Sequence, residues 1–357
     1  MPVSLTTTPY GILPDGRAVN AHHLANDGGI RISLLDYGAT LASVAFPDRT
    51  GRTADVTHGF NDLTGWLGNQ SYFGANIGRF GNRIAAGKFS LEGKTYQLAT
   101  NNTPGGIPCH LHGGNAGFDK RLWQSRPVQK TDAAGVEFTY LSPDGEEGYP
   151  GNLSSTVTYW LSEKNELTIE FRATTDQATI VNLTNHVYWN LTGDPSKPIT
   201  GHQVQLEADA ILPTDAGLIP LGTKLPVKNT PFDFNEPHAI GSRINDDNPH
   251  LKTAGGYDHC WVLRGENKLR LAARVAEPEL GRKFELFTDQ PGVQLYSGNF
   301  LTGTAKGKGG ANYPFRTAFC LEPQNFPDAP NQPAFPSAVL RPGKTYSHTL
   351  VYRFSCE

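Results

Sequence analysis

The chain has 357 residues, with 31 basic and 34 acidic side chains that give a formal net charge of −3. This near-neutral charge and the lack of a basic run argue against nucleic acids and anionic membranes as partners. No apolar run reaches the roughly 18 residues that a membrane-spanning helix needs. We therefore expect no nucleic-acid partner and no membrane partner.

The N-terminal segment and the cysteines bear on the cellular compartment. The segment MPVSLTTTPYGILPDG lacks the basic and apolar regions of a secretion signal, although a mature form whose signal had been removed would look the same. Cys109, Cys260, Cys320 and Cys356 form no CxxC pair, which argues against a zinc ribbon or a thioredoxin-type site. We expect free buried thiols in a reducing compartment, which favours a cytoplasmic protein.

Turn-forming residues are frequent, since the chain contains 39 glycines and 26 prolines. They interrupt helices and favour a turn-rich β protein. Alternating apolar and polar positions predict strands at Arg31–Tyr37, Lys88–Leu98 (a hairpin that turns at Glu92-Gly93), Val136–Leu141, Leu153–Leu161, 166–173, Ala178–Asn190, Gln203–Ala208, Leu269–Val275, Lys283–Thr288, Gly292–Tyr296, Phe319–Glu322 and His348–Phe354.

This distribution of strands predicts the fold class. Period-two alternation over so many segments is typical of large antiparallel sheets packed as a β-sandwich. Helical patterns are few, and Asn61–Asn69 could form one or two turns. No internal repeat or linker-like change in composition divides the chain. We expect an all-β protein with few short helices and a single domain spanning residues 1–357.

Two motifs in the first third of the chain carry candidate ligand contacts. The segment GANIGRFGNRI does not have the GxGxxG spacing of a dinucleotide site, but Asn82 and Arg83 could hold an oxygen-rich ligand. The CHLHGG motif carries His110 and His112, which would point to the same side of an extended segment. It lacks the following glutamate of a cupin-type metal site. A metal ligand, a sugar contact and an ordinary polar role therefore stay open for these histidines.

The NLTNHVYWNL motif has a two-sided pattern. Alternation places Asn182, Thr184, His186 and Tyr188 on one face of a strand and large apolar side chains on the other. Such a polar stripe indicates either a surface facing solvent or a wet cavity beside the core. Cavities of this kind bind sugars through polar groups and aromatic faces.

Three later motifs supply further polar groups. YDHCW contains Asp258 and His259, QPGVQLYSGNF places Gln294 and Tyr296 on one strand face, and FCLEPQNFPD puts Glu322 at a strand end. A glutamate there could accept a proton at neutral pH. Taken together with the earlier motifs, these groups suit a neutral polyhydroxylated ligand and proton transfer.

The order of the motifs resembles the aldose 1-epimerase (galactose mutarotase) family. The matching segments, from about Tyr10 to the C-terminal strand, include GRFGNRI, HLHGG, GFDKRLW, NLTNHVYWNL, YDHC, QPGVQLYSGNF and LEPQNFPDAPNQPAFPS. The resemblance implies one large antiparallel sandwich, the galactose mutarotase-like supersandwich, with a sugar cleft on one sheet. It also implies interconversion of the α and β anomers of free aldohexoses such as galactose and glucose, with no metal and no organic cofactor.

The resemblance assigns roles to individual residues. It implies that Glu322 is the general base and His186 the general acid, and that six other residues contact the sugar: Asn82, Arg83, His112, Tyr188, Asp258 and Gln294. A carboxylate near His186 would raise the pKa of the imidazole and keep part of it protonated at neutral pH. The segments GGIPC and FG, ahead of HLHGG and NRI, depart from the family pattern and leave the preferred sugar open.

Three alternatives remain at this point. A hexose-6-phosphate 1-epimerase would need a cationic cluster to hold the phosphate. A glycoside hydrolase could use Asp258 and Glu322 as its carboxylate pair. A non-catalytic carbohydrate-binding protein would bind the sugar without accelerating anomer exchange. The oligomeric state also stays open, as a monomer or a homodimer.

Overall fold

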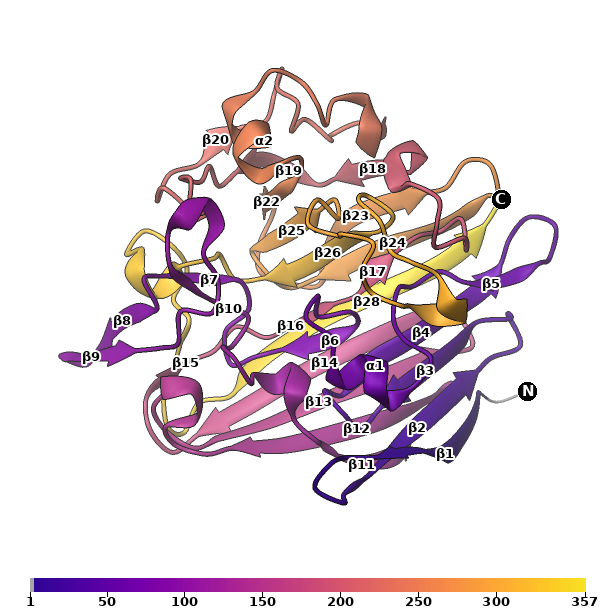
Figure 1. Cartoon of the computed structure of the whole chain (residues 1–357), viewed down its shortest axis with the longest axis horizontal. Helices are drawn as coiled ribbons and strands as arrows, with labels where there is room; N and C mark the ends of the chain where they lie inside the picture. Colours follow the sequence, from indigo (N-terminus) through magenta and orange to yellow (C-terminus); the bar gives the residue numbers. More distant parts are fainter. Residues whose placement is uncertain (1–2) are drawn as a thin grey trace.

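Long antiparallel strands dominate the computed structural model, which describes residues 3–357 (Figure 1). In β13, alternation buries Val157, Tyr159 and Leu161 on one face, as the sequence predicted. This strand belongs to the largest sheet, which has nine strands in the order β11 (Gln124–Gln129), β12 (Ala133–Ser142), β13 (Leu153–Ser162), β14 (Glu166–Thr175), β28 (Tyr346–Cys356), β24 (Arg282–Thr288), β23 (Arg270–Ala276), β18 (Gln203–Leu206) and β21 (His238–Ala239).

Two smaller sheets share a hydrophobic core with the nine-stranded sheet. One has the order β1 (Ser4–Ile12), β2 (Ala18–Ala25), β3 (Arg31–Leu35), β4 (Thr40–Pro47) and β5 (Thr53–Asp55). The other has the order β17 (Tyr188–Trp189), β26 (Phe319–Gln324), β25 (Gly292–Tyr296), β22 (Asp258–Leu263), β19 (Ala208–Ile211) and β20 (Leu225–Pro226). Ile32, Tyr159, Trp261 and Tyr352, from all three sheets, lie in one buried cluster. This layered packing confirms the predicted all-β sandwich.

Short pairs of strands and a few helical turns complete the fold. The pairs are β7 (Arg83–Ala85) with β10 (Cys109–Leu111), β6 (Ala75–Ile77) with β16 (Thr184–His186), β8 (Lys88–Leu91) with β9 (Lys94–Gln97), and β15 (Thr179–Ile180) with β27 (Val339–Leu340). The α-helices among residues 3–357 are α1 (Leu63–Leu67) and α2 (Pro249–Ala254). The 3₁₀ turns are Pro104–Gly106, Phe118–Lys120, Glu146–Gly148, Ile199–Gly201, Ile240–Ser242, Lys308–Gly310 and Ala329–Asn331.

The local predictions fare differently along the chain. The hairpin of β8 and β9 turns at Glu92 and Gly93, which both have positive φ as a tight two-residue turn requires. The side chain of Asp62 caps α1 by accepting from the backbone N–H of Gly65, so the short helix expected there is confirmed. The strands β1, β2 and β4 were not predicted. They are rich in threonine and alanine, and β1 is a largely exposed edge strand without clear alternation.

The continuous strand predicted at Ala178–Asn190 is wrong in one respect. The segment is divided into β15, β16 and β17, with breaks at residues 181–183 and at Val187. Asn182, at the start of its polar stripe, is fully buried, donates to the carbonyl of Gly81 and accepts from the N–H of Asn325. Of the polar stripe, only His186 and Tyr188 therefore face a cavity, because the three short strands pair with different partners.

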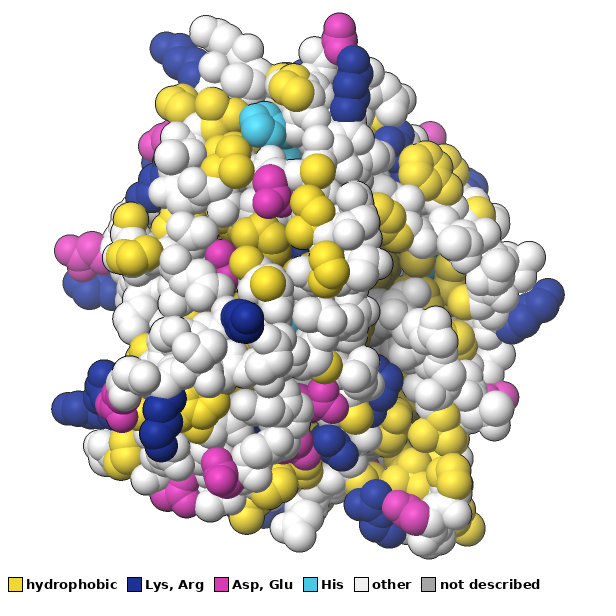
Figure 2. Space-filling view, turned by 60° about the vertical axis from the view of Figure 1, so that its left-hand side comes forward, with side chains coloured by type: hydrophobic (Ala, Val, Ile, Leu, Met, Phe, Trp, Pro, Cys, Tyr) yellow, Lys and Arg dark blue, Asp and Glu magenta, His cyan; other side chains and the backbone are white. Residues whose placement is uncertain are grey.

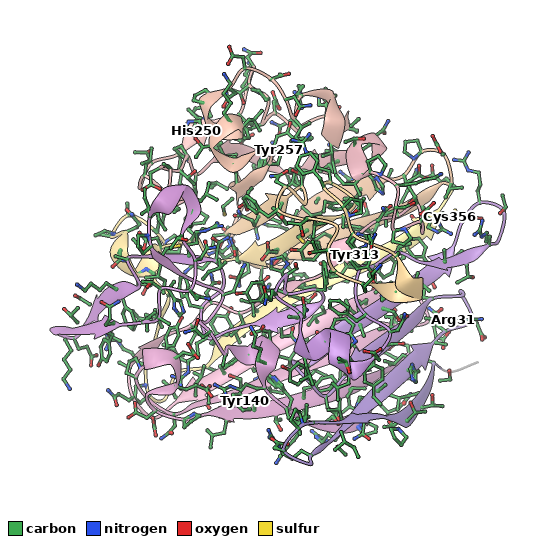
Figure 3. The ribbon with its side chains drawn as sticks, in the orientation of Figure 1. Arg31, Tyr140, His250, Tyr257, Tyr313 and Cys356 are labelled. Atoms are coloured by element: carbon green, nitrogen blue, oxygen red, sulfur yellow. The ribbon has the colours of Figure 1, made fainter. Side chains whose placement is uncertain are left out.

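Charged side chains lie on the surface, and the cysteines are free and mostly buried. Basic and acidic side chains are scattered over the face shown in Figure 2. All four cysteines are free; three are buried, and Cys356, at the end of β28, is partly exposed (Figure 3). Among residues 3–357, no helix is both long and apolar enough to cross a membrane.

Several histidines are buried in the neutral state, and His202 is the clearest example. It is 1 % exposed, and its Nε2 atom accepts a hydrogen bond of 2.9 Å from the backbone N–H of Leu191. Burial lowers the pKa of His202 from 6.5 to about 3. Below about pH 6.5 His202 is therefore protonated in the unfolded chain but stays neutral in the folded chain. This difference lowers the free energy of unfolding as the pH falls from about 6.5 toward 3.

We expect the substitution His202→Gln to reduce the acid sensitivity of folding. Between roughly pH 7.5 and pH 5, the wild-type free energy of unfolding should fall by about 2 kcal/mol more than that of the variant, because one buried imidazole no longer opposes protonation. Urea unfolding at both pH values measures the difference. His238→Gln, at a half-buried histidine, is the matched control; equal losses in wild type and His202→Gln would contradict the expectation.

Candidate active site

A cleft of about 680 Å³ opens over the six-stranded sheet. Its floor follows from strand register, because directly opposite residues of antiparallel strands have side chains on the same face. Asp258 of β22 lies opposite Tyr296 of β25, which lies opposite Cys320 of β26, which lies opposite Tyr188 of β17. Seven of the eight predicted site residues line the cleft: Asn82, Arg83, His112, His186, Tyr188, Asp258 and Glu322.

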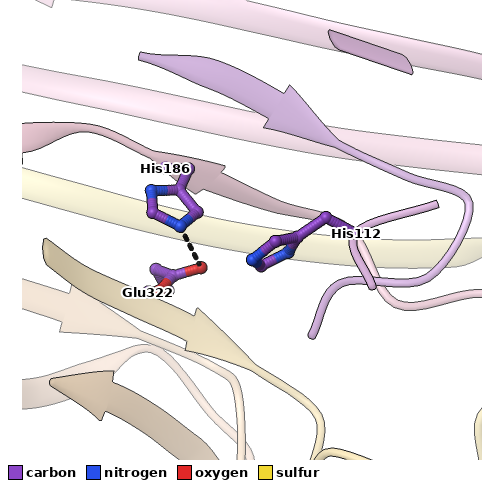
Figure 4. A group of neighbouring side chains, drawn as sticks. All are labelled: His112, His186 and Glu322. Atoms are coloured by element: carbon purple, nitrogen blue, oxygen red, sulfur yellow. Dashed lines mark ion pairs between the residues drawn. The ribbon is translucent and has the colours of Figure 1, made fainter. Parts of the chain in front are cut away.

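His186 and Glu322 face each other at the centre of this cleft. The Nε2 atom of His186 lies 3.6 Å from the Oε2 atom of Glu322, and the two side chains come from β16 and β26 (Figure 4). Only 5 % of His186 and 2 % of Glu322 is exposed. The Oε2 atom of Glu322 has no hydrogen-bond partner among the described residues. A buried carboxylate oxygen without a partner is poised to receive a hydroxyl from a ligand.

Burial sets the protonation of this pair. Desolvation lowers the pKa of His186 from 6.5 to about 4. Desolvation, and next the charge of Asp258, raise the pKa of Glu322 well above its usual value of 4.5, while Arg83 opposes the rise. The expectation that a nearby carboxylate raises the pKa of His186 is therefore wrong, because the loss of water outweighs the attraction between the two side chains. Burial therefore favours a neutral imidazole and a protonated carboxyl over the ionised pair.

Arg83 and Asp258 form a second polar pair beside the first. The Nη1 atom of Arg83 lies 3.6 Å from the Oδ2 atom of Asp258, and its Nε atom donates to the Oδ1 atom of Asn102 at 3.2 Å. The Oδ1 atom of Asp258 accepts a hydrogen bond of 2.7 Å from the amide of Gln294. These contacts hold a guanidinium and a carboxylate, which can donate to and accept from sugar hydroxyls.

Gln294 is the predicted site residue that does not line the cleft. Its amide nitrogen is bound to Asp258, and its amide oxygen accepts from Gln324 at 3.4 Å. Both ends of the side chain are therefore occupied within the protein, and the structure places Gln294 behind Asp258. Its direct contact with a sugar stays a prediction.

The two histidines of the CHLHGG motif have different surroundings. β10 ends at Leu111, and His112 has a φ of 49°, so the extended geometry that would place both side chains on one side is absent. His110 is fully buried: its Nδ1 atom is 2.8 Å from the carbonyl of Ala99 and its Nε2 atom 2.6 Å from the hydroxyl of Tyr149. His110 therefore has a structural place, and His112 alone reaches the cleft.

The backbone of Asn82 determines which nitrogen of His112 carries the proton. Asn82 has a φ of 65°, a conformation that asparagine tolerates better than most residues. Its N–H donates to the Nδ1 atom of His112 at 3.1 Å. Burial lowers the pKa of His112 well below 6.5, so the imidazole is neutral and carries its proton on Nε2. His112 therefore presents a fixed, uncharged donor.

This tautomer also bears on metal binding. His112, His186 and Glu322 offer donor atoms within 4.8 Å of one another, a set of the kind that binds zinc. A metal at the Nε2 atom of His112 would require the proton to move to Nδ1, where it would face the N–H of Asn82. The arrangement does not suit a metal. The prediction that the protein uses none stays a prediction.

Tyr72 is a cleft residue that sequence reasoning missed. Its ring lies 4.8 Å from that of His112 and 5.9 Å from that of His186, and the ammonium group of Lys120 lies 5.3 Å from the ring centre. Its φ of 60° turns the backbone so that the side chain covers both histidines. A lone tyrosine before a Phe-Gly pair carries no pattern that could have identified it.

The fold and the cleft together define a β-sandwich protein with an imidazole and a carboxyl buried side by side. The aldose 1-epimerase family model matches residues 20–353. Galactose mutarotase from Homo sapiens is 47% identical over 352 residues, covering 99% of each chain, and aldose 1-epimerase from Escherichia coli K12 is 38% identical over 357 residues, covering 99% of this chain and 100% of that one. The crystal structure of galactose 1-epimerase from Lactobacillus acidophilus superimposes with a TM-score of 0.86 at 28% identity, covering 99% of both chains. The chain belongs to the aldose 1-epimerase family and is an isomerase.

Proposed function

We propose that this protein interconverts the α and β anomers of free aldohexoses such as galactose and glucose. The observation that carries the proposal is the buried pair of His186 and Glu322, 3.6 Å apart in the cleft. The names of the relatives, galactose mutarotase and aldose 1-epimerase, support this class of substrate. The two side chains have the complementary acid and base chemistry that anomer exchange requires.

The reaction begins with opening of the hemiacetal ring. Ionised Glu322 takes the proton of the C1 hydroxyl while protonated His186 gives its Nε2 proton to the ring oxygen O5. The C1–O5 bond breaks with its electron pair going to O5, and C1 becomes an aldehyde. The C1–C2 bond then rotates by roughly half a turn, and the same two residues exchange roles as O5 attacks the other face of C1.

The electrostatics of the site favour the protonation state of the open-chain sugar complex. After ring opening, Glu322 is protonated and His186 is neutral, which is also the state that burial favours in the ligand-free pair. The closed-ring complex instead needs the ionised pair. In the closed-ring complex, the sugar hydroxyl and the charge of Arg83 stabilise the carboxylate of Glu322. Proton transfer then neutralises both Glu322 and His186, and this loss of buried charge favours ring opening.

Neighbouring residues hold the sugar in the orientation that this mechanism requires. His112 donates its Nε2–H to a sugar oxygen without changing charge. Arg83 and Asp258, which are ion-paired, bind hydroxyls on the far side of the ring and direct O5 toward His186. Tyr188 stacks against His186 at 5.0 Å and gives the sugar an aromatic surface. Because the bound sugar is held next to both proton carriers, proton transfer becomes a step within one complex and does not require a further collision.

The charge of the cleft favours a neutral sugar over a phosphosugar. Arg83 is the lone lysine or arginine among the described residues that line the cleft, and its charge is shared with Asp258. Arg79, four residues before Arg83 in the sequence, does not line the cleft. It is buried and donates to the hydroxyl and the carbonyl of Ser142. A phosphate dianion would meet too few cations there.

We further propose that the chain acts as one domain in the cytoplasm, as a monomer or a homodimer. The shared core of the three sheets supports a single domain. The four free cysteines support a reducing compartment. In this setting the partners would be small-molecule aldoses, and no cofactor would be needed.

The substitutions Glu322→Gln and His186→Asn should each slow mutarotation by about 100-fold or more, because each removes one positioned proton carrier. Polarimetry of freshly dissolved α-D-glucose measures the rate, after subtraction of the spontaneous reaction. Circular dichroism and the melting temperature provide the control for folding. Near wild-type turnover in either folded variant would refute the mechanism.

The pH dependence of kcat/KM should reflect a pair that holds one proton. We expect a level profile through pH 6.5 and a fall as the pH drops toward about 4, where His186 gains a second proton for the pair. On the alkaline side, activity should decline only above the raised pKa of Glu322, where the shared proton is lost. An inflection centred on pH 6.5 would contradict this assignment.

Glucose should be a better substrate than glucose 6-phosphate by at least about tenfold in kcat/KM, since the lone guanidinium of the cleft is already paired. Rates for both compounds can be compared by NMR of the anomeric protons, with galactose and xylose in the same series. Faster conversion of glucose 6-phosphate would favour the phosphosugar alternative. Sugar binding without any acceleration would favour a non-catalytic binding protein.

A further inference from the structure

The imidazole of His186 packs against aromatic rings, but stacking alone does not orient its nitrogen atoms. Tyr188 lies 5.0 Å away at 22° and Tyr72 lies 5.9 Å away at 28°, both nearly parallel to the imidazole. His112 meets it edge-on at 4.9 Å. A half-turn about χ2 would preserve these contacts while exchanging Nδ1 with Cδ2 and Nε2 with Cε1. Besides the contact of Nε2 with Glu322, a directional contact at Nδ1 would therefore select one orientation.

Cys320 supplies this contact. Its Sγ atom lies 3.5 Å from the Nδ1 atom of His186, and the residue is fully buried. It stands on β26 between β17 and β25, directly opposite Tyr188 on one side and Tyr296 on the other. Strand pairing on both sides leaves the thiol little room to move. With Nδ1 at the sulfur, Nε2 faces Glu322 at 3.6 Å.

We propose that Cys320 is a positioning residue, whose thiol binds the Nδ1 atom of His186 and thereby keeps Nε2 directed at Glu322 and the sugar. The proposal rests on the proposed function, in which His186 transfers its proton through Nε2. Cys320 takes no part in proton transfer itself. Its effect is to maintain the one ring orientation that reaches the substrate.

A thiol suits this position because its sulfur can accept a hydrogen bond from Nδ1–H without carrying a charge. Burial, and next the charges of Glu322 and Asp258, raise the pKa of the Cys320 thiol well above 9, so it stays protonated. After His186 has given its Nε2 proton to O5, the neutral ring keeps its other proton on Nδ1, where it donates to the sulfur, and Nε2 is free to take the proton back on ring closure. When His186 is protonated, its Nδ1–H donates to the sulfur. The same partner therefore serves both states of the catalytic cycle.

A carboxylate in place of the thiol would behave differently. It would hold the imidazolium and oppose release of the proton to O5. The charged and titratable groups that face His186 are Glu322, His112, Tyr72, Tyr188 and Cys320 itself. Among them Glu322 is the one carboxylate, so the thiol leaves the proton exchange of His186 to Glu322 and the sugar.

Kinetics of cysteine variants test the proposal. Cys320→Ala should lower kcat about 10- to 100-fold with KM changed less than about threefold, because the imidazole loses its orientation while the sugar contacts persist. Cys320→Ser should restore kcat to within about threefold of wild type, since a hydroxyl also donates and accepts. Cys260→Ala is the matched control, because Cys260 is a buried thiol of the same sheet that contacts the carbonyl of Trp261 rather than a histidine.

Nitrogen-15 NMR of histidine-labelled protein gives a readout that does not depend on activity. Wild type and Cys320→Ser should show His186 as a single tautomer protonated at Nδ1 near neutral pH, and Cys320→Ala should show a mixed or exchanging signal. If Cys320→Ala does not fold, Cys320→Val replaces it as an apolar variant of similar size. Unchanged kcat and an unchanged His186 signal in the folded apolar variant would overturn the proposal. A wild-type protein that does not accelerate mutarotation would instead refute the proposed function, and the NMR result would still decide the contact.

Discussion

Removal of water from one imidazole and one carboxyl is the constraint on which the site depends. His186 and Glu322 lie 3.6 Å apart and are almost completely buried. In water such a pair would be ionised, whereas here burial lowers the pKa of the imidazole and raises that of the carboxyl. In the proposed mechanism, the same desolvation that disfavours the ion pair makes the loss of its charges favourable during ring opening. The remainder of the cleft would then supply the polar contacts that hold the sugar against this pair.

The sandwich provides the rigidity that this arrangement needs. Glu322, Asp258 and Tyr188 stand on paired strands of one sheet, so register fixes their spacing. Residues from shorter segments complete the cleft by means of unusual backbone conformations, with positive φ at Tyr72, Asn82 and His112. Strain of this kind is tolerated where surrounding packing determines the conformation, and it often occurs at functional sites. The site is thus formed by residues on a regular sheet together with a few residues of unusual backbone conformation.

Much of the fold and of the site could be predicted from the sequence. Alternation identified β13, β14 and β25, and the ordered motifs identified seven residues that line the cleft. Prediction failed where the deciding contact is distant in the chain. The edge strand β1 has little alternation of its own and is defined by pairing with β2. For Gln294 the sugar contact stays a prediction; its strand was predicted, but its two internal hydrogen bonds could not be read from its neighbours in sequence.

By itself, the sequence determined which chemical groups are present and which strand faces carry them, because alternation along a strand is a local property. It also determined the membership of the family, through motifs spread over nearly the whole chain. Only the tertiary structure decided the direction in which the pKa of His186 shifts, the tautomer of His112 and the partner of the Nδ1 atom of His186. These depend on burial and on hydrogen bonds between residues such as Cys320 and His186, which are 134 positions apart. No local pattern encodes the solvent that folding removes from a side chain.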